Sequence, residues 1–140
     1  FKPLEEVEAH EFDHMMAVNV RAPLLLAKYA LPELRRRHGA IVNVSSIAGT
    51  GGFAHGSSYV ATKFALRGLS QCWMQELRGD NIRVLCVQPG STLTDFNDGM
   101  MRKSDKRVLH PEDVARIVRA ALELDDRAMV SEITIRPTNP

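Results

Sequence analysis

Three short segments rich in apolar and β-branched residues alternate with longer segments of helical periodicity, and this alternation constrains the fold more than any other feature. The predicted strands are residues 40–45, 82–87 and 132–135. The first two are nearly continuous apolar runs, which is typical of strands covered on both faces. Strands that alternate with helices predict an α/β fold with an open, mostly parallel sheet and helices on both faces.

Apolar residues at spacings of three and four predict the helices between these strands. The predicted helices are residues 7–37, 58–78 and 111–124. Pro23 lies inside the first helix, so we expect a kink or break between Asn19 and Pro23. Serines at the end of the preceding loop can cap the second helix, and Pro111 suits the first position of the third.

Size and charge indicate a single globular domain over residues 1–140. The chain has 18 Lys and Arg against 17 Asp and Glu, a formal charge of +1, with the two signs mixed along the sequence. This mixture argues against a nucleic-acid or membrane surface. The longest apolar stretch, residues 22–27, is far shorter than the roughly 20 residues of a membrane span, and the first residues lack a signal-peptide pattern. We therefore expect a cytoplasmic protein.

The two cysteines, Cys72 and Cys86, give neither a disulfide framework nor a zinc-binding spacing. Both lie in apolar periodic segments, where a thiol usually acts as a small hydrophobic side chain. We expect no metal site.

Polar or glycine-containing loops follow the first two predicted strands, and ligands of open parallel sheets bind beyond the carboxyl ends of strands. Ser46 follows the first strand, and Pro89 and Gly90 end the second. These two loops form the candidate site. The later stretch, residues 91–109, lacks periodicity and is expected to form a loop or short lid, with apolar residues Phe96, Met100 and Met101.

Tyr59 and Lys63 stand four residues apart at the start of a predicted helix, about 40° apart around its axis. A neighbouring ammonium favours the ionised phenol, so the pair could act as a general acid or base. The same spacing also occurs on solvated helix faces. Ser46 could hydrogen-bond an oxygen that Tyr59 also contacts, or could merely cap a turn.

A serine hydrolase is an alternative from another class of enzyme. His55 lies near Ser46 in sequence, but a solvated loop histidine is the simpler interpretation. The chain also lacks a nucleophile elbow of the Gly-x-Ser-x-Gly type around this serine.

Five motifs, in the right order, resemble those of the carboxyl-terminal, catalytic part of a classical short-chain dehydrogenase/reductase. They are the strand and serine loop at 39–49, the Tyr-x-x-x-Lys helix start at 57–63, the Val-Asn-Val of 18–20, the Pro-Gly loop at 87–94 and the helix start at 110–115. The resemblance implies a Rossmann-like, doubly wound parallel sheet, of which this chain is the partial, C-terminal half.

The resemblance also implies roles for individual residues. Tyr59 would donate or accept the proton, Lys63 would assist it and hold the nicotinamide ribose, and Ser46 would hydrogen-bond the substrate oxygen. Asn19 would order a water in a proton relay to Lys63. The remaining contacts to the nicotinamide of NAD or NADP would come from Pro89, Gly90, Thr92 and Thr94.

The implied activity is hydride transfer between a nicotinamide cofactor and a small carbonyl compound or secondary alcohol, in a homodimer or homotetramer. The glycine-rich turn that holds the cofactor pyrophosphate in this family has no counterpart here, since the glycines of residues 49–56 follow the catalytic strand. We therefore expect the 140 residues alone to be inactive. The alternative is a non-catalytic fragment that acts only in subunit assembly or docking.

Overall fold

Three parallel strands form one sheet in the order β1–β2–β3 in the computed structural model, which describes residues 1–96 and 108–138. The strands are β1 (Ala40–Val44), β2 (Arg83–Pro89) and β3 (Glu132–Ile135). Helix α3 (Ser57–Glu76) connects β1 to β2, and α4 (Pro111–Leu122) precedes β3. The predicted α/β fold with a partial Rossmann-like sheet is confirmed. Met100 and Met101 of the predicted lid lie outside the described residues.

The first predicted helix is one continuous helical path with a π-helical turn in it. Helix α1 (Ala9–Met16) runs into the turn Ala17–Arg21 and then into α2 (Ala22–Arg37). Within the turn, the N–H of Ala22 bonds to the carbonyl of Ala17, five residues back. Pro23 follows directly and has no N–H to donate, which explains why the regular pattern changes here. No helix in the described residues is long and apolar enough to cross a membrane.

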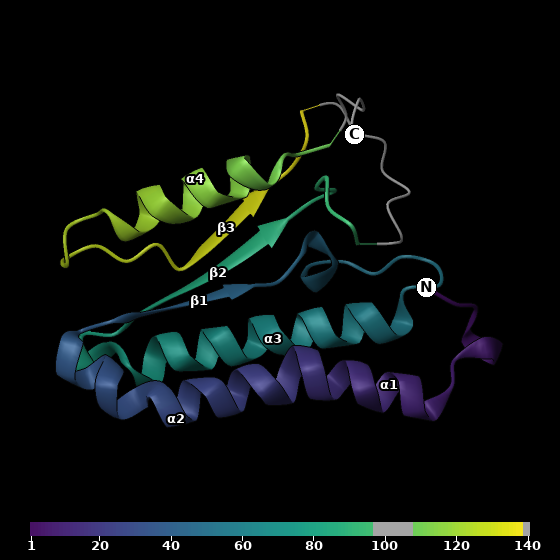
Figure 1. Ribbon diagram of the computed structural model, residues 1–140, viewed down its shortest axis with the longest axis horizontal. Helices are drawn as coiled ribbons and strands as arrows, with labels where there is room; N and C mark the ends of the chain where they lie inside the picture. The colour runs from purple at the N-terminus through teal and green to yellow at the C-terminus, as the bar shows by residue number, and fades with distance from the viewer. Residues whose placement is uncertain (97–107, 139–140) are drawn as a thin grey trace.

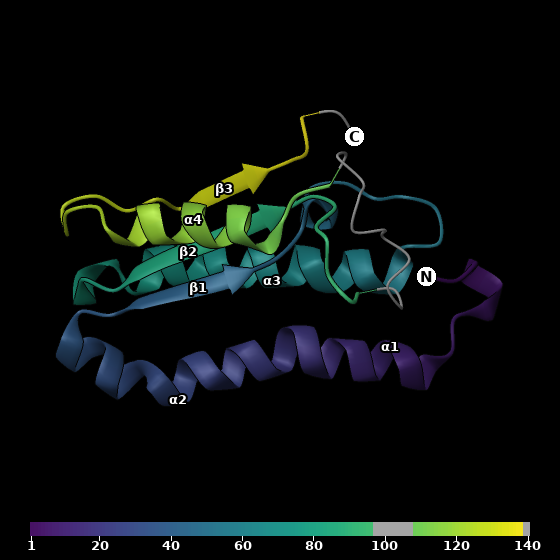
Figure 2. The same cartoon turned by 45° about the horizontal axis from the view of Figure 1, so that its top comes forward.

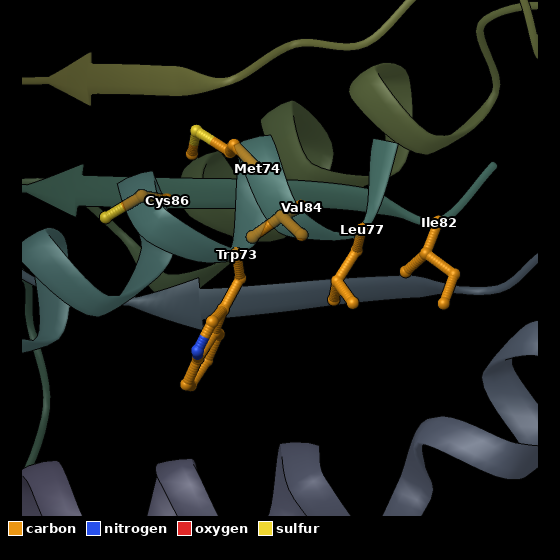
Figure 3. Packing of buried hydrophobic residues seen from close by; sticks show 6 residues of the cluster. All are labelled: Trp73, Met74, Leu77, Ile82, Val84 and Cys86. Carbon is orange, nitrogen blue, oxygen red and sulfur yellow. The ribbon is translucent and has the colours of Figure 1, made fainter. Parts of the chain in front are cut away.

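The helices cover both faces of the sheet (Figures 1 and 2). On one face, α2 and α3 pack against β2 through a cluster of buried side chains from α3, β2 and the segment between them, all of which Figure 3 shows. Its buried members are Trp73, Met74, Leu77, Ile82, Val84 and Cys86. On the other face, Leu85 and Val87 of β2 pack against α4. The alternation along β2 places successive residues in the two layers.

Three details of the sequence-based prediction are wrong. Strand β1 is only partly buried: Ile41 and Val42 pack against the clusters on the two faces of the sheet, but Val44 is exposed and the strand is paired along one edge only, with β2. Helix α3 has Gly56 at its N-cap and receives no side-chain cap from the described serines. Cys72 is exposed on α3, because it lies on the side of the helix away from the sheet, whereas Cys86 is buried as expected.

A polar cluster joins α3 to β2 and β3. The carboxylate of Glu132 accepts hydrogen bonds from Arg67, at 2.9 to 3.2 Å, and from Gln71 at 2.7 Å. The buried amide of Gln88 donates to the same carboxylate at 3.2 Å and accepts from Thr134 at 2.9 Å. Both the nitrogen and the oxygen of the Gln88 side-chain amide therefore have hydrogen-bond partners. These side-chain bonds favour the observed register of β2 against β3, in addition to the backbone hydrogen bonds between the strands.

The Glu132 cluster predicts an acid-dependent loss of stability. The hydrogen bond from Arg67 lowers the pKa of Glu132, so its stabilisation is present above the ordinary carboxyl pKa and is lost as pH falls through the lowered value. We expect Glu132→Gln to reduce the free energy of unfolding at pH 7 by about 1–3 kcal/mol, and to flatten its decline below about pH 4.5.

Urea denaturation at a series of pH values measures this effect. Glu76→Gln, which changes an exposed carboxylate on α3, is the matched control and should follow the parent curve. Parallel acid limbs for Glu132→Gln and the parent would contradict the prediction.

Candidate functional site

The carboxyl ends of the strands point toward the same end of the molecule, where the first turn of α3 and the N-terminal segment also lie (Figure 1). An open cavity of about 1260 Å³ lies there. All eight residues predicted for the site line this cavity: Asn19, Ser46, Tyr59, Lys63, Pro89, Gly90, Thr92 and Thr94. Parallel strands place their carboxyl ends at one edge of the sheet, which is why loops far apart in sequence meet here.

Ser46 caps the short 3₁₀-helix Ile47–Gly49 that follows β1. Its Oγ accepts a hydrogen bond from the N–H of Ala48 at 3.1 Å. The interpretation of Ser46 as a cap is therefore correct. It does not exclude a hydrogen bond from Ser46 to a substrate oxygen, because a hydroxyl that accepts a hydrogen bond still has its own proton to donate. Among the described contacts of Ser46 there is no histidine ring, so the structure gives no support to the hydrolase alternative.

Tyr59 and Lys63 lie in the first two turns of α3 and both face the cavity. The Lys63 Nζ atom is 5.6 Å from the centroid of the Tyr59 ring and donates a hydrogen bond to the carbonyl of Val44 at 3.1 Å. The ammonium is thus held between the end of β1 and the phenol. Burial lowers the pKa of Lys63, because the charged form loses water, and the remaining charge acts more strongly on its neighbours than it would in solvent.

The last two residues of β1 and Ser45, which follows them, form a hydrogen-bonded seam with α3. The buried amide of Asn43 donates to Ser70 at 2.8 Å, and the carbonyl of Val44 accepts from Lys63. The buried hydroxyl of Ser45 donates to the carbonyl of Lys63 at 3.0 Å. We call these three bonds the β1–α3 seam; it sets the distance between the serine loop and the start of α3.

Asn19, in the π-helical turn, is hydrogen-bonded to α3. Its amide donates to the hydroxyl of Thr62 at 3.2 Å, and this hydroxyl donates to the carbonyl of Tyr59 at 2.8 Å. Asn19 therefore fastens the kinked helix to the first turn of α3. The water relay expected for Asn19 remains a prediction.

The loop after β2 supplies the other wall of the cavity. The N–H of Gly90 donates to the carbonyl of Ile135 at 2.8 Å, and the hydroxyl of Thr92 donates back to the carbonyl of Gly90 at 2.9 Å. Thr94 accepts from the N–H of Phe96 at 3.3 Å. These bonds fold residues 89–96 into a turn that faces Ser46 and Tyr59 across the cavity.

Sequence reasoning did not identify Asn43, Ser45 and Thr62 as parts of the site's framework. All three are buried polar residues with side-chain hydrogen bonds. A signal was present, since a polar residue within an apolar strand or on the inner face of a helix needs a partner. The sequence could not say which partner.

A family described as short chain dehydrogenase matches residues 1–105. The chain is 31% identical over 140 residues to a sepiapterin reductase of Chlorobaculum tepidum, covering 99% of this chain and 57% of that protein.

Two solved structures extend the likeness to the fold. An alcohol dehydrogenase from the archaeon Thermococcus sibiricus, complexed with 5-hydroxy-NADP, matches with a TM-score of 0.91 at 30% identity, over 100% of this chain and 59% of that one. A metagenomic short-chain oxidoreductase in complex with NADP matches with a TM-score of 0.79 at 34% identity, over 97% and 56%. The chain thus spans less than two thirds of the length of these proteins.

Gly49 gives a test of how closely the serine loop approaches α3. A Cβ at this position would lie 2.8 Å from the Ser45 hydroxyl and 2.9 Å from the Lys63 carbonyl, so Gly49→Ala must push the loop away from the helix. We expect a loss of about 1–3 kcal/mol in the free energy of unfolding, measured by urea denaturation.

Gly51→Ala is the matched control in the same loop. An added Cβ there meets nothing within 4 Å among the described residues, and we expect a change below about 1 kcal/mol. Equal effects of the two substitutions would mean that the loop does not depend on close approach at Gly49.

Proposed function

The chain belongs to the short-chain dehydrogenase family, and on that basis we propose that it carries the catalytic residues of an oxidoreductase. The proposed reaction transfers a hydride between NAD or NADP and a carbonyl compound or secondary alcohol. The observation that supports it best is the meeting of Ser46, Tyr59 and Lys63 at one cavity beyond the carboxyl ends of the strands. A module used only for assembly has no need of this arrangement.

The residues lining the cavity fit the nicotinamide end of such a cofactor. The turn at residues 89–94 presents backbone and hydroxyl groups opposite the ammonium of Lys63. The backbone at Gly90 packs so closely that an added Cβ would lie 3.2 Å from the side chain of Pro137. Two similar proteins were solved with NADP or 5-hydroxy-NADP. When bound, the nicotinamide supplies or accepts the hydride. In our proposal its contacts come from Pro89, Gly90, Thr92 and Thr94, with Lys63 at the ribose.

The proton is handled by the chain's own side chains. In the direction of reduction, the Tyr59 hydroxyl donates its proton to the carbonyl oxygen while the carbonyl carbon gains the hydride, so that an alcohol forms. Ser46 donates a hydrogen bond to the same oxygen and stabilises the charge that develops on it. Lys63, 5.6 Å from the phenol ring, stabilises the resulting phenolate.

Asn19 has a second proposed role in returning the proton. Its amide nitrogen is occupied by Thr62, which leaves its carbonyl oxygen available to a water molecule. We propose that this water links Lys63 with solvent. The role is compatible with the structural one, because the two use different atoms of the same side chain.

Subunit assembly is the second candidate function. Leu26 and Tyr29 on α2 and Phe64 on α3 are large hydrophobic side chains that are exposed. Such residues suit packing between copies in a homodimer or homotetramer. Assembly and catalysis are compatible, and substitution of Tyr59 separates them, since it affects catalysis alone.

Tyr59→Phe removes one hydroxyl and leaves a similar ring. In the full-length protein we expect it to lower the turnover number by about 10²- to 10⁴-fold and to leave the dissociation constant of the cofactor nearly unchanged. Steady-state kinetics with a carbonyl substrate and fluorescence titration with NADPH and NADH measure the two effects.

Tyr29→Phe is the matched control, because Tyr29 is the other tyrosine of the chain and is exposed on α2 with Lys28 at 5.8 Å from its ring. It should retain full activity. If Tyr59→Phe kept more than about half of the parental rate, Tyr59 would not be the acid.

Lys63→Met removes the ammonium beside the phenol. We expect the cofactor to bind about 10-fold more weakly and the turnover number to fall, since the same ammonium is proposed to hold the ribose and to stabilise the phenolate. Steady-state kinetics and the dissociation constant of the cofactor measure these changes.

Lys28→Met, beside Tyr29 and away from the cavity, is the control and should match the parent in both measurements. An unchanged turnover number together with unchanged cofactor affinity in Lys63→Met would limit Lys63 to a structural role, its hydrogen bond to Val44.

A further inference from the structure

Four aromatic rings from four separate segments meet at the cavity. Phe1 contacts Tyr59 edge-on, with ring centroids 5.6 Å apart, and Phe96 lies 5.7 Å from Tyr59. Phe53 contacts Phe1 at 5.4 Å, and Phe1 and Phe96 are 6.4 Å apart. All four rings line the cavity. We call Phe1, Phe53 and Phe96 the aromatic rim; two of its rings, Phe1 and Phe96, contact the ring of Tyr59.

Local contacts hold each segment of the rim in place. The Phe53 ring rests on Gly56, where a Cβ would lie only 2.6 Å from the ring, so a glycine is needed for this packing. The residue after Phe1 donates its N–H to the carbonyl of His55 at 3.0 Å, which fixes the N-terminal segment beside the loop. The N–H of Phe96 is bonded to Thr94. Each segment that carries a ring of the aromatic rim is therefore held in place by contacts of its own.

The rings of the rim are not buried by one another. Phe1, Phe53 and Phe96 remain 61%, 48% and 57% exposed, because edge-on contacts leave ring faces uncovered. Uncovered aromatic faces around a reactive group are typical of a binding site for a flat apolar group. Core packing does not explain them, since the buried clusters lie elsewhere, on the faces of the sheet.

Charge at the same cavity is partly neutralised. The ammonium of Lys2 is bonded to both carboxylate oxygens of Glu11 at 2.7 Å, so these two lining residues satisfy one another. Arg136 and three histidines also line the cavity, while the contacts described for the Tyr59 ring are with Phe1, Phe96 and the Lys63 ammonium.

We propose that the aromatic rim binds an aryl group bonded directly to the reacting carbon, so that the substrate class is aryl ketones and the matching 1-aryl alcohols. This inference rests on the proposed function. A carbonyl oxygen within hydrogen-bond reach of Tyr59 places its substituent against Phe1 and Phe96, the two rings in contact with Tyr59. In reduction the carbonyl carbon gains the hydride of the reduced nicotinamide and the oxygen gains the Tyr59 proton.

The test compares acetophenone with cyclohexyl methyl ketone, which has the same carbon skeleton with a saturated ring. The kcat/KM ratio of the two ketones is measured in the full-length protein and in Phe53→Leu and Phe96→Leu. We expect each substitution to reduce the preference for acetophenone by about 2- to 10-fold. Phe12→Leu is the control and should leave the ratio unchanged, because Phe12 is a ring on α1 that is not among the described residues lining the cavity.

A second measurement does not depend on turnover. Saturation-transfer NMR in the Tyr59→Phe background compares binding of the two ketones in the presence of NADPH. Stronger binding of acetophenone, weakened by Phe96→Leu, supports the aromatic site. If the parent full-length protein binds acetophenone in this way but reduces neither ketone, the absence of reduction contradicts the proposed function and leaves the aromatic site supported. Reduction of both ketones with a ratio that neither rim substitution changes, or equal binding of the two ketones, would overturn the inference and leave the proposed function intact.

Discussion

The β1–α3 seam is the interaction on which the arrangement of the site depends. Asn43, Val44 and Ser45 are consecutive, and each bonds to a residue of α3. Ser46 follows directly, so its hydroxyl is placed by a strand end that is itself fastened to the helix carrying Tyr59 and Lys63. Groups that must act on one substrate atom need rigid support of this kind, because small displacements weaken catalysis.

The seam also explains why the nearby backbone is so closely packed. Two of its side chains, Asn43 and Ser45, are buried, and a buried polar group is costly unless its partner stays within hydrogen-bond distance. Gly49 allows the serine loop to approach α3 closely enough, since any side chain there would meet Ser45 and the Lys63 backbone. Lys63 belongs both to the seam and to the proposed chemistry, so packing and catalysis constrain the same residue.

The polar floor of the cavity and its aromatic rim have different origins. Ser46 and Lys63 sit on regular elements or immediately beside them, where neighbouring strands and helices determine their positions. Phe1, Phe53 and Phe96 come from irregular segments and meet through contacts among themselves. Loops on a rigid scaffold are where binding specificity usually resides. On this view the scaffold carries the general chemistry, and the rim selects the substrate.

The sequence by itself predicted the element order and the parallel sheet, because periodicity is a local property, and its resemblance to a known family supplied the eight residues of the candidate site. It also located the irregularity before Pro23, where a missing N–H has a direct consequence. Only the tertiary structure decided the partners of Asn43, Ser45 and Thr62, the exposure of Val44 at the end of β1, and the meeting of three phenylalanines near Tyr59. These features depend on contacts between residues far apart in the chain. The identity of a buried polar residue predicts that it needs a hydrogen-bond partner, but only the fold determines which residue lies close enough to be that partner.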